Sequence, residues 1–275
     1  MASGLATRQA ATVSSDHRMS LGAISQQFLQ QVETVTGLPV HVEADERLQP
    51  PLLAKVQIAR RGVPLHRVAY HPSARAMADY LIAFQCSFVL RLHSLPPSER
   101  FDLADAPGAR PDPMDWVRAH AASAQLPPDR QRAFADFLRT SLVSMLRSMP
   151  VGIWVDHELR TRFPELREVQ EQAVRRQIDT HAALFRPEVQ RSVPDHPWRL
   201  SLAMNAAFAK FWGQELGQPG WILPYQAAGV AAQGEALLRQ LRERSDNPSH
   251  DRALIDSWAE ELGLNAWLQW IPYSP

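Results

Sequence analysis

The chain has 275 residues, of which 45% are hydrophobic, so it is long enough to build one large or two modest hydrophobic cores. Its 29 basic residues are balanced by 29 acidic ones, which removes the bulk positive charge that favours binding to nucleic acid or to an anionic membrane. The single cysteine, Cys86, excludes an intrachain disulfide and a cysteine-rich zinc module.

The beginning of the chain predicts a tail and no membrane segment. Residues 1–20 are small and polar without a period, which is typical of a disordered tail. They lack the basic and then apolar segments of an export signal, and no later run approaches 18 uninterrupted apolar residues. Together with the lone cysteine, this predicts a cytoplasmic protein with no membrane association.

Residues 21–95 predict a small α/β domain that opens with a helix. In LGAISQQFLQQVETVTG the apolar residues recur at the helical spacing of three or four, and Gly37 stands where a helix-ending glycine belongs. The positions that define this face are Ile24, Phe28, Val32 and Val35. Three short strands are expected next, because apolar and polar residues alternate in PVHVEAD, LLAKVQIARRG and VPLHRVAYHP. We expect these strands to form a meander, followed by a second helix.

The composition changes after residue 95. Residues 96–113 are rich in proline and have no apolar period, so they predict a linker or surface loop. Residues 114–275 predict a helical domain. Its expected helices are Met114–Ala124, Asp129–Ser148, Pro164–Phe185, Trp198–Leu216, Tyr225–Ser245 and His250–Leu262. The predicted fold class is therefore α+β, mainly α: a small helix, three-strand meander and helix, followed by a large helical part.

The second helix of the small domain carries the run ADYLIAFQCSFVLRL, residues 78–92. At 100° per residue, Gln85 falls among apolar side chains. A polar amide in that position needs a hydrogen-bond partner, so Gln85 is either a structural residue or the remnant of a functional site.

The arrangement of residues 21–92 resembles the minimal zinc metallopeptidase-like domains related to the ImmA and IrrE regulators. In that family the helix after the third strand carries H-E-x-x-H, whose two histidines bind zinc while the glutamate activates the bound water. The resemblance places Gln85, Cys86 and Val89 at the motif positions, and all three depart from the motif. It therefore implies a degenerate peptidase-like domain without zinc chemistry on this helix.

A second polar segment, GIWVDHELRTRF, contains Asp156, His157 and Glu158. His157 and Glu158 are candidate metal ligands, but no histidine follows four residues later, so the sequence predicts no bound metal. We expect Asp156 and Glu158 to begin or cap a short helix that faces the helix of Gln85.

Two classes of function remain open. The preferred interpretation is a non-catalytic interaction or regulatory protein of bacterial type, without a cofactor, that binds a protein partner and has the capacity to form a homodimer. Arg60, Arg61 and Arg67 lack interleaved aromatic residues, which argues against nucleic-acid binding. The alternative is an enzyme, a hydrolase of unrecognised type, with a site between the α/β and helical parts. Its candidate catalytic residues are Gln85, Asp156, Glu158 and His71.

Overall fold

A computed structural model describes residues 21–48, 52–106, 108 and 110–274. The tail expected at residues 1–20 lies outside this range. The chain divides into two compact units. Unit 1 consists of Met1–Phe101, Val155–Ala173 and Pro272–Pro275, and unit 2 of Asp102–Trp154 and Val174–Ile271. The expected fold class, α+β and mainly α with a small three-stranded sheet and a large helical part, is confirmed.

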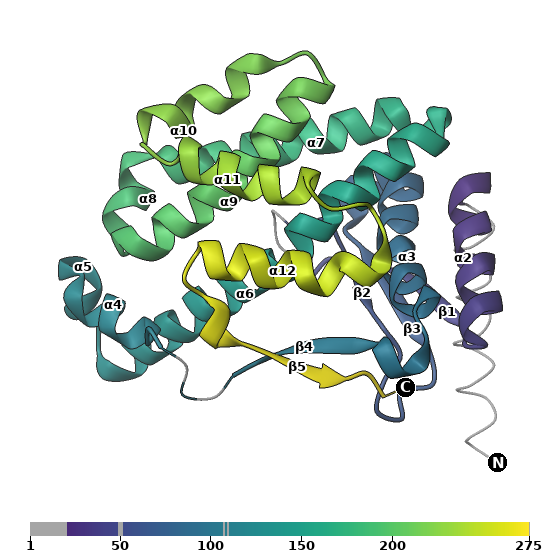
Figure 1. Ribbon diagram of the computed structural model, residues 1–275, viewed down its shortest axis with the longest axis horizontal. Helices are drawn as coiled ribbons and strands as arrows, with labels where there is room; N and C mark the ends of the chain where they lie inside the picture. Colours follow the sequence, from purple (N-terminus) through teal and green to yellow (C-terminus); the bar gives the residue numbers. More distant parts are fainter. Residues whose placement is uncertain (1–20, 49–51, 107, 109, 275) are drawn as a thin grey trace. The chain divides into compact units, whose positions relative to one another are not determined.

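Unit 1 holds the small sheet and the two helices predicted around it. Its elements up to Phe101 are α2 (Ala23–Thr36), β1 (Val40–Ala44), β2 (Ala54–Gln57), β3 (His66–Tyr70), the 3-10 helix η1 (Pro72–Met77), α3 (Ala78–Ser94) and the 3-10 helix η2 (Pro97–Glu99). Gly37 ends α2 with a φ of 70° and donates its N–H to Glu33 O, as the sequence predicts. In Figure 1, α2 and α3 lie side by side, and α3 also packs on β2 and β3.

The strand order corrects the expected meander. The sheet has the order β1-β3-β2, with β1 parallel and β2 antiparallel to β3. Val42 therefore pairs with Val68 from one side, and Val56 pairs with the same residue from the other. The central strand is the most buried, because both of its edges are covered, and Val68 is 0% exposed. Alternation in the sequence identifies strands but carries no information on which strands are neighbours.

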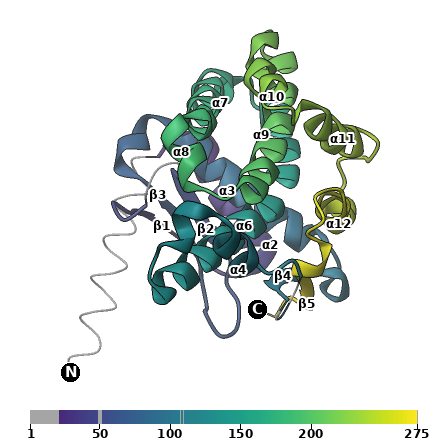
Figure 2. The same ribbon diagram turned by 90° about the vertical axis from the view of Figure 1, so that its left-hand side faces the viewer.

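Unit 2 is built from helices. Its elements, including the two long helices that continue into unit 1, are α4 (Pro113–Ala119), α5 (Ala121–Ala124), α6 (Pro128–Arg162), α7 (Arg167–Ala182), α8 (Pro187–Ser192), α9 (Asp195–Glu215), α10 (Leu223–Ala227), α11 (Ala231–Arg242) and α12 (Asp251–Glu261). Its short 3-10 helices are η4 (Ala183–Phe185), η5 (Pro219–Ile222), η6 (Pro248–His250) and η7 (Asn265–Trp267), whereas η3 (Pro164–Leu166), between α6 and α7, belongs to unit 1. Figure 2 shows α9, α11 and α12 in succession.

The core of unit 2 forms around α9. Every residue from Leu202 to Ala209 on this helix is buried, so this stretch of α9 is covered on all sides. Gly234 of α11 lets the two helices approach closely, because a Cβ there would lie 2.5 Å from Ala206 Cβ. Trp267 is 1% exposed and its Nε1 donates to Pro111 O at 2.9 Å.

The segment expected to be a loop contains a strand. Residues Phe101–Asp105 form β4, which pairs with β5 (Leu268–Pro272). The buried carboxylate of Asp102 accepts a hydrogen bond from Arg147 at 2.8 Å. The prediction of a linker over residues 96–113 is therefore wrong for residues 101–105. This strand is stabilised by a partner strand more than 160 residues away. Its own five residues are too few to show a strand pattern in the sequence.

Helix α6 is longer than the sequence predicts and does not stop at Pro150. Residues 149–156 are all buried, and this burial stabilises the helix through the proline. Asp156 and Glu158 consequently lie inside α6, and the expectation that they begin or cap a short helix is wrong. No helix in the described part of the chain is both long enough and apolar enough to cross a membrane.

Candidate functional site

The most buried polar network of unit 1 centres on Asp156. The Tyr80 hydroxyl of α3 donates to Asp156 Oδ1 at 2.6 Å. Gln170 of α7 donates its Nε2 to the Asp156 backbone oxygen at 2.6 Å and lies 3.3 Å from Oδ1. Asp156 is 3% exposed and Gln170 is 0% exposed. The network therefore joins α3 to the stretches of α6 and α7 that belong to unit 1, through the single residue Asp156.

Burial controls the charge of this carboxyl group. Removal from water raises the pKa of Asp156 to about 7, although the hydrogen bonds from Tyr80 and Gln170 act in the opposite direction. Burial, and secondarily the Asp156 charge, raise the pKa of Tyr80 well above its ordinary value. Tyr80 thus stays a hydrogen-bond donor at neutral pH, while Asp156 exchanges its proton near pH 7. A carboxyl group in this state has the proton affinity required of a general acid or base.

Gln85 lies on α3, half-buried, and donates its Nε2 to Ala54 O of β2 at 3.3 Å. The expected need for a hydrogen-bond partner is therefore confirmed, and that partner is the sheet backbone. His71 lies at the start of η1, where its Nδ1 accepts from Ser73 N at 3.2 Å and is 2.7 Å from Ser73 Oγ. His71 acts there as the N-cap of the 3-10 helix.

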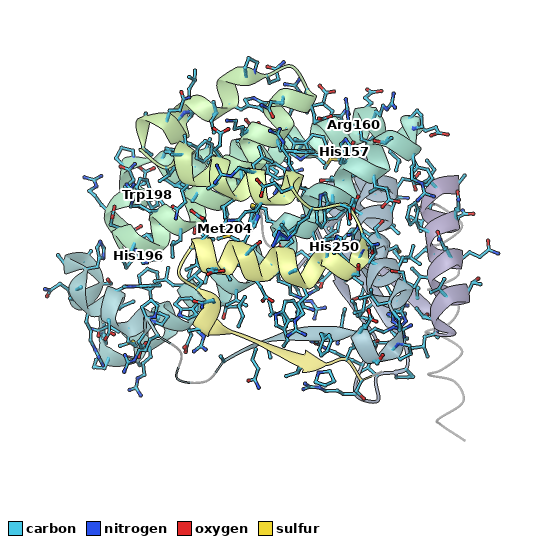
Figure 3. The ribbon with its side chains drawn as sticks, viewed as in Figure 1. His157, Arg160, His196, Trp198, Met204 and His250 are labelled. Carbon is cyan, nitrogen blue, oxygen red and sulfur yellow. The ribbon has the colours of Figure 1, made fainter. Side chains whose placement is uncertain are left out.

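The remaining candidates lie on the last turns of α6. His157 is exposed and Glu158 forms an ion pair with Arg162 one turn later. Figure 3 shows His157 and Arg160 along the same helix. Within the described ranges, no group of three histidine, cysteine, aspartate or glutamate side chains is placed to hold a metal ion. Among the predicted site residues, Asp156 contacts α3, which is also the helix of Gln85. Its hydrogen bond on that helix comes from Tyr80 and not from Gln85.

A second polar cluster of unit 1 was not predicted. His66 of β3, His93 of α3, Arg100 and Tyr273 lie together, and we call these four residues the histidine cluster. The His66 and His93 ring centroids are 5.9 Å apart at 87°, and those of His93 and Tyr273 are 5.6 Å apart at 81°. Arg100 Nη1 is 3.3 Å from His93 Nδ1.

The sequence contained little information on these contacts. Tyr80 is one of several aromatic residues in an apolar run, and Gln170 lies in a segment of mixed polar residues without a motif. Positions 66 and 71 point to opposite faces of an ideal strand, and the structure shows His66 as the buried one, at 0% exposed. Tyr273 reaches His93 across 180 residues of sequence, which no local pattern predicts.

Comparison with known proteins finds no matching family model, no similar curated protein and no similar solved structure.

Proposed function

We propose that this chain is a non-catalytic interaction protein that acts in regulation by binding a protein partner, and that its small α/β part is a degenerate metallopeptidase-like domain. The observation that carries the proposal is an exposed aromatic face on α6 in unit 2. Phe137 is 63% exposed, and its ring stacks on that of Phe134 with centroids 6.5 Å apart and planes at 14°. This stacked pair, whose outer ring remains in water, offers aromatic area that a partner can bury.

The residues around Phe137 support a docking role. Positions one or two turns away on the same helical face are Ala133, Thr140 and Ser144, and all three are exposed. The neighbours one turn away, Ala133 and Thr140, carry no formal charge, and Arg130, two turns before Phe137, is the charged residue on this face. A partner that covers Phe137 and its immediate neighbours therefore does not have to desolvate an ion. An aromatic anchor surrounded by small or weakly polar residues fits an apolar groove on another protein.

The contacts of the candidate catalytic residues in unit 1 also support a non-catalytic role. Gln85 bonds to the sheet backbone, His71 caps η1, and Glu158 pairs with Arg162. Each side chain therefore has a local structural use. Their partners differ, so these three residues do not converge on one reacting atom.

Site-specific photo-crosslinking tests the proposal. A photoreactive amino acid at Thr140, one turn from Phe137, is expected to trap a discrete adduct in cells, and Phe137→Ser is expected to abolish it. The matched control places the same probe at Arg132, which lies roughly 140° from Phe137 around the helix. An adduct with a second copy of the chain, together with a mass of twice 30.9 kDa by light scattering, would identify a homodimer. Equal trapping at both positions, or at neither, would contradict the proposal.

The Asp156 network favours a second candidate, an enzyme of hydrolase type. A carboxyl group whose pKa lies near 7 and which accepts from a tyrosine hydroxyl has the properties of a general acid or base. This candidate predicts turnover of at least one substrate in a panel of fluorogenic esters, amides and phosphates, with an apparent pKa near 7. Asp156→Asn is expected to abolish that turnover while the circular dichroism spectrum is retained. Turnover that survives the substitution would exclude Asp156 from the reaction.

A further inference from the structure

Unit 1 contains a second arrangement that is independent of the proposed function. Residues Pro272–Ser274 belong to unit 1, although the preceding strand β5 belongs largely to unit 2. Tyr273 N donates to Arg100 O at 2.9 Å, and Arg61 N donates to Ser274 O at 3.1 Å. The Tyr273 hydroxyl donates to Ala59 O. We call the segment Pro272–Ser274 the clasp.

The clasp and the histidine cluster share their contacts. Ala59 donates its N–H to His66 Nδ1 at 3.1 Å and accepts from the Tyr273 hydroxyl through its carbonyl oxygen. The Tyr273 ring packs against the His93 ring, and Arg100 contacts both His93 and Tyr273. The Arg100 side chain contacts His93, and its backbone oxygen accepts from Tyr273 N, so a displacement of the His93 ring acts directly on the Tyr273 ring.

Hydrogen bonding determines where the neutral histidines carry their protons. A guanidinium group and a backbone N–H only donate, so Nδ1 of both His93 and His66 must accept. Each neutral ring consequently carries its proton on Nε2. Neither Nε2 has a hydrogen-bond partner in the part of the chain that the structure describes. The rings of His66 and His93, and those of His93 and Tyr273, are near-perpendicular.

This tautomer makes protonation of His93 disruptive. The added proton goes to Nδ1, which faces the Arg100 guanidinium at 3.3 Å. An acceptor then becomes a donor that faces another donor, and two positive charges stand in a buried position, since His93 is 9% exposed. Arg100 also donates to His93 O at 3.0 Å and to Leu95 O at 2.8 Å, so its side chain is held in place at the end of α3.

We propose that the clasp is a proton-responsive latch, which is closed while His93 is neutral and opens when His93 is protonated. The charged and titratable groups that face His93 are Arg100 and His66, and the Tyr273 ring covers it. Arg60 adds a positive charge near the Tyr273 hydroxyl. No acidic group is among these contributors, so the surroundings oppose a second positive charge.

The pH range follows from the protonation of His93 in the closed and open states. Burial, followed by the charges of Arg100 and His66, lowers the pKa of His93 to about 4. In an open, hydrated state the pKa of His93 returns to its ordinary value of about 6.5. The open state therefore binds more protons between these values, and a fall of one pH unit within this range favours opening by about tenfold.

Amide hydrogen exchange tests the latch. The N–H groups of Tyr273 and Arg61 form the two backbone bonds of the clasp, so their protection factors are expected to fall about tenfold per pH unit below pH 6.5. The Asp45 amide, which donates to Tyr70 O at the other end of the sheet, serves as the internal control and is expected to keep its protection. Protection that is independent of pH, or that increases on acidification, would overturn the proposal.

Three variants assign the effect to His93. His93→Gln keeps an acceptor for Arg100 but does not titrate, so the pH dependence of Tyr273 protection is expected to disappear. His93→Phe keeps the ring contact with Tyr273 and also does not titrate. It replaces His93→Gln if that variant does not fold, and the pH dependence of Tyr273 protection is again expected to disappear. His71→Gln replaces a histidine outside the cluster and is expected to retain the dependence of the unmodified protein. An unchanged dependence in the His93 variants, or an equal loss at Asp45, would exclude the latch.

Discussion

At the scale of single residues, unit 1 depends on polar groups that lie in low-dielectric surroundings. Asp156, Tyr80 and Gln170 satisfy one another, but Gln170 Oε1 stays buried without a hydrogen-bond partner within the described ranges. Such a network restricts the relative positions of the helices that contribute to it, because each member would leave an unpaired group if it moved. Burial in this network raises the pKa of Asp156 to about 7, so its carboxyl group ionises only at near-neutral pH.

Tyr80→Phe tests this network. The substitution removes the donor to Asp156 Oδ1 and is expected to lower the free energy of unfolding by about 1–3 kcal/mol. The loss should be larger at pH 8.5 than at pH 6, because the hydrogen bond stabilises mainly the ionised carboxylate, and Asp156 ionises near pH 7. Urea unfolding followed by circular dichroism at the two pH values measures both quantities.

Asp156→Asn provides the control for this experiment. In a protein that already carries Asp156→Asn the acceptor no longer titrates, so the cost of Tyr80→Phe is expected to become independent of pH. A pH dependence that persists in the double variant would show that another group is responsible.

At the scale of elements, the packing of unit 2 depends on small residues between α9 and α11. A Cβ on Gly234 would lie 3.0 Å from Ala203 O as well as 2.5 Å from Ala206 Cβ. Both neighbours are close to the helix axis and have no flexible end that could move aside. The contact therefore depends on the absence of a side chain at this position.

Gly234→Ala is expected to destabilise unit 2 by about 1–3 kcal/mol, although alanine has the higher helix propensity. The steric effect dominates because the propensity gain is at most about 1 kcal/mol. Gly220→Ala is the matched control, since a Cβ there meets only Leu223 Cδ1 at 3.9 Å. Thermal unfolding of both variants measures the difference in stability. A Gly234→Ala protein that is more stable than the unmodified one would show that α9 and α11 do not approach as closely as the structure shows.

At the scale of the whole molecule, buried titratable groups act on stability in opposite directions. His93 and His181 each have a pKa that burial lowers to about 4, so their contribution to stability is present above pH 6.5 and is lost as the pH falls toward 4. Asp156 has a raised pKa, so its contribution is complete below pH 4 and is lost as the pH rises through 7. His66, whose pKa burial also lowers, adds to the histidine effect.

The melting temperature is therefore expected to be highest near pH 6.5. Below this value the three histidines outweigh the one aspartate, and each kcal/mol lost lowers the melting temperature by about 2–4 °C. Above it, the smaller decline due to Asp156 should be absent in Asp156→Asn. Differential scanning calorimetry from pH 4.5 to 8 measures the fall of the melting temperature on both sides of pH 6.5. A melting temperature that increases continuously on acidification would contradict the assignment of buried neutral histidines.

The sequence by itself determined the fold class, the helix ending at Gly37, the presence of three strands and the need of Gln85 for a partner. These features depend on local backbone preferences and on the spacing of apolar residues, which are properties of consecutive positions. The tertiary structure alone decided the order β1-β3-β2, the continuation of α6 through Pro150 and the pairing of β4 with β5. It also brought Tyr80 to Asp156 and Tyr273 to His93. These outcomes depend on burial and on hydrogen bonds between residues far apart in the chain, and local periodicity contains no information on such distances.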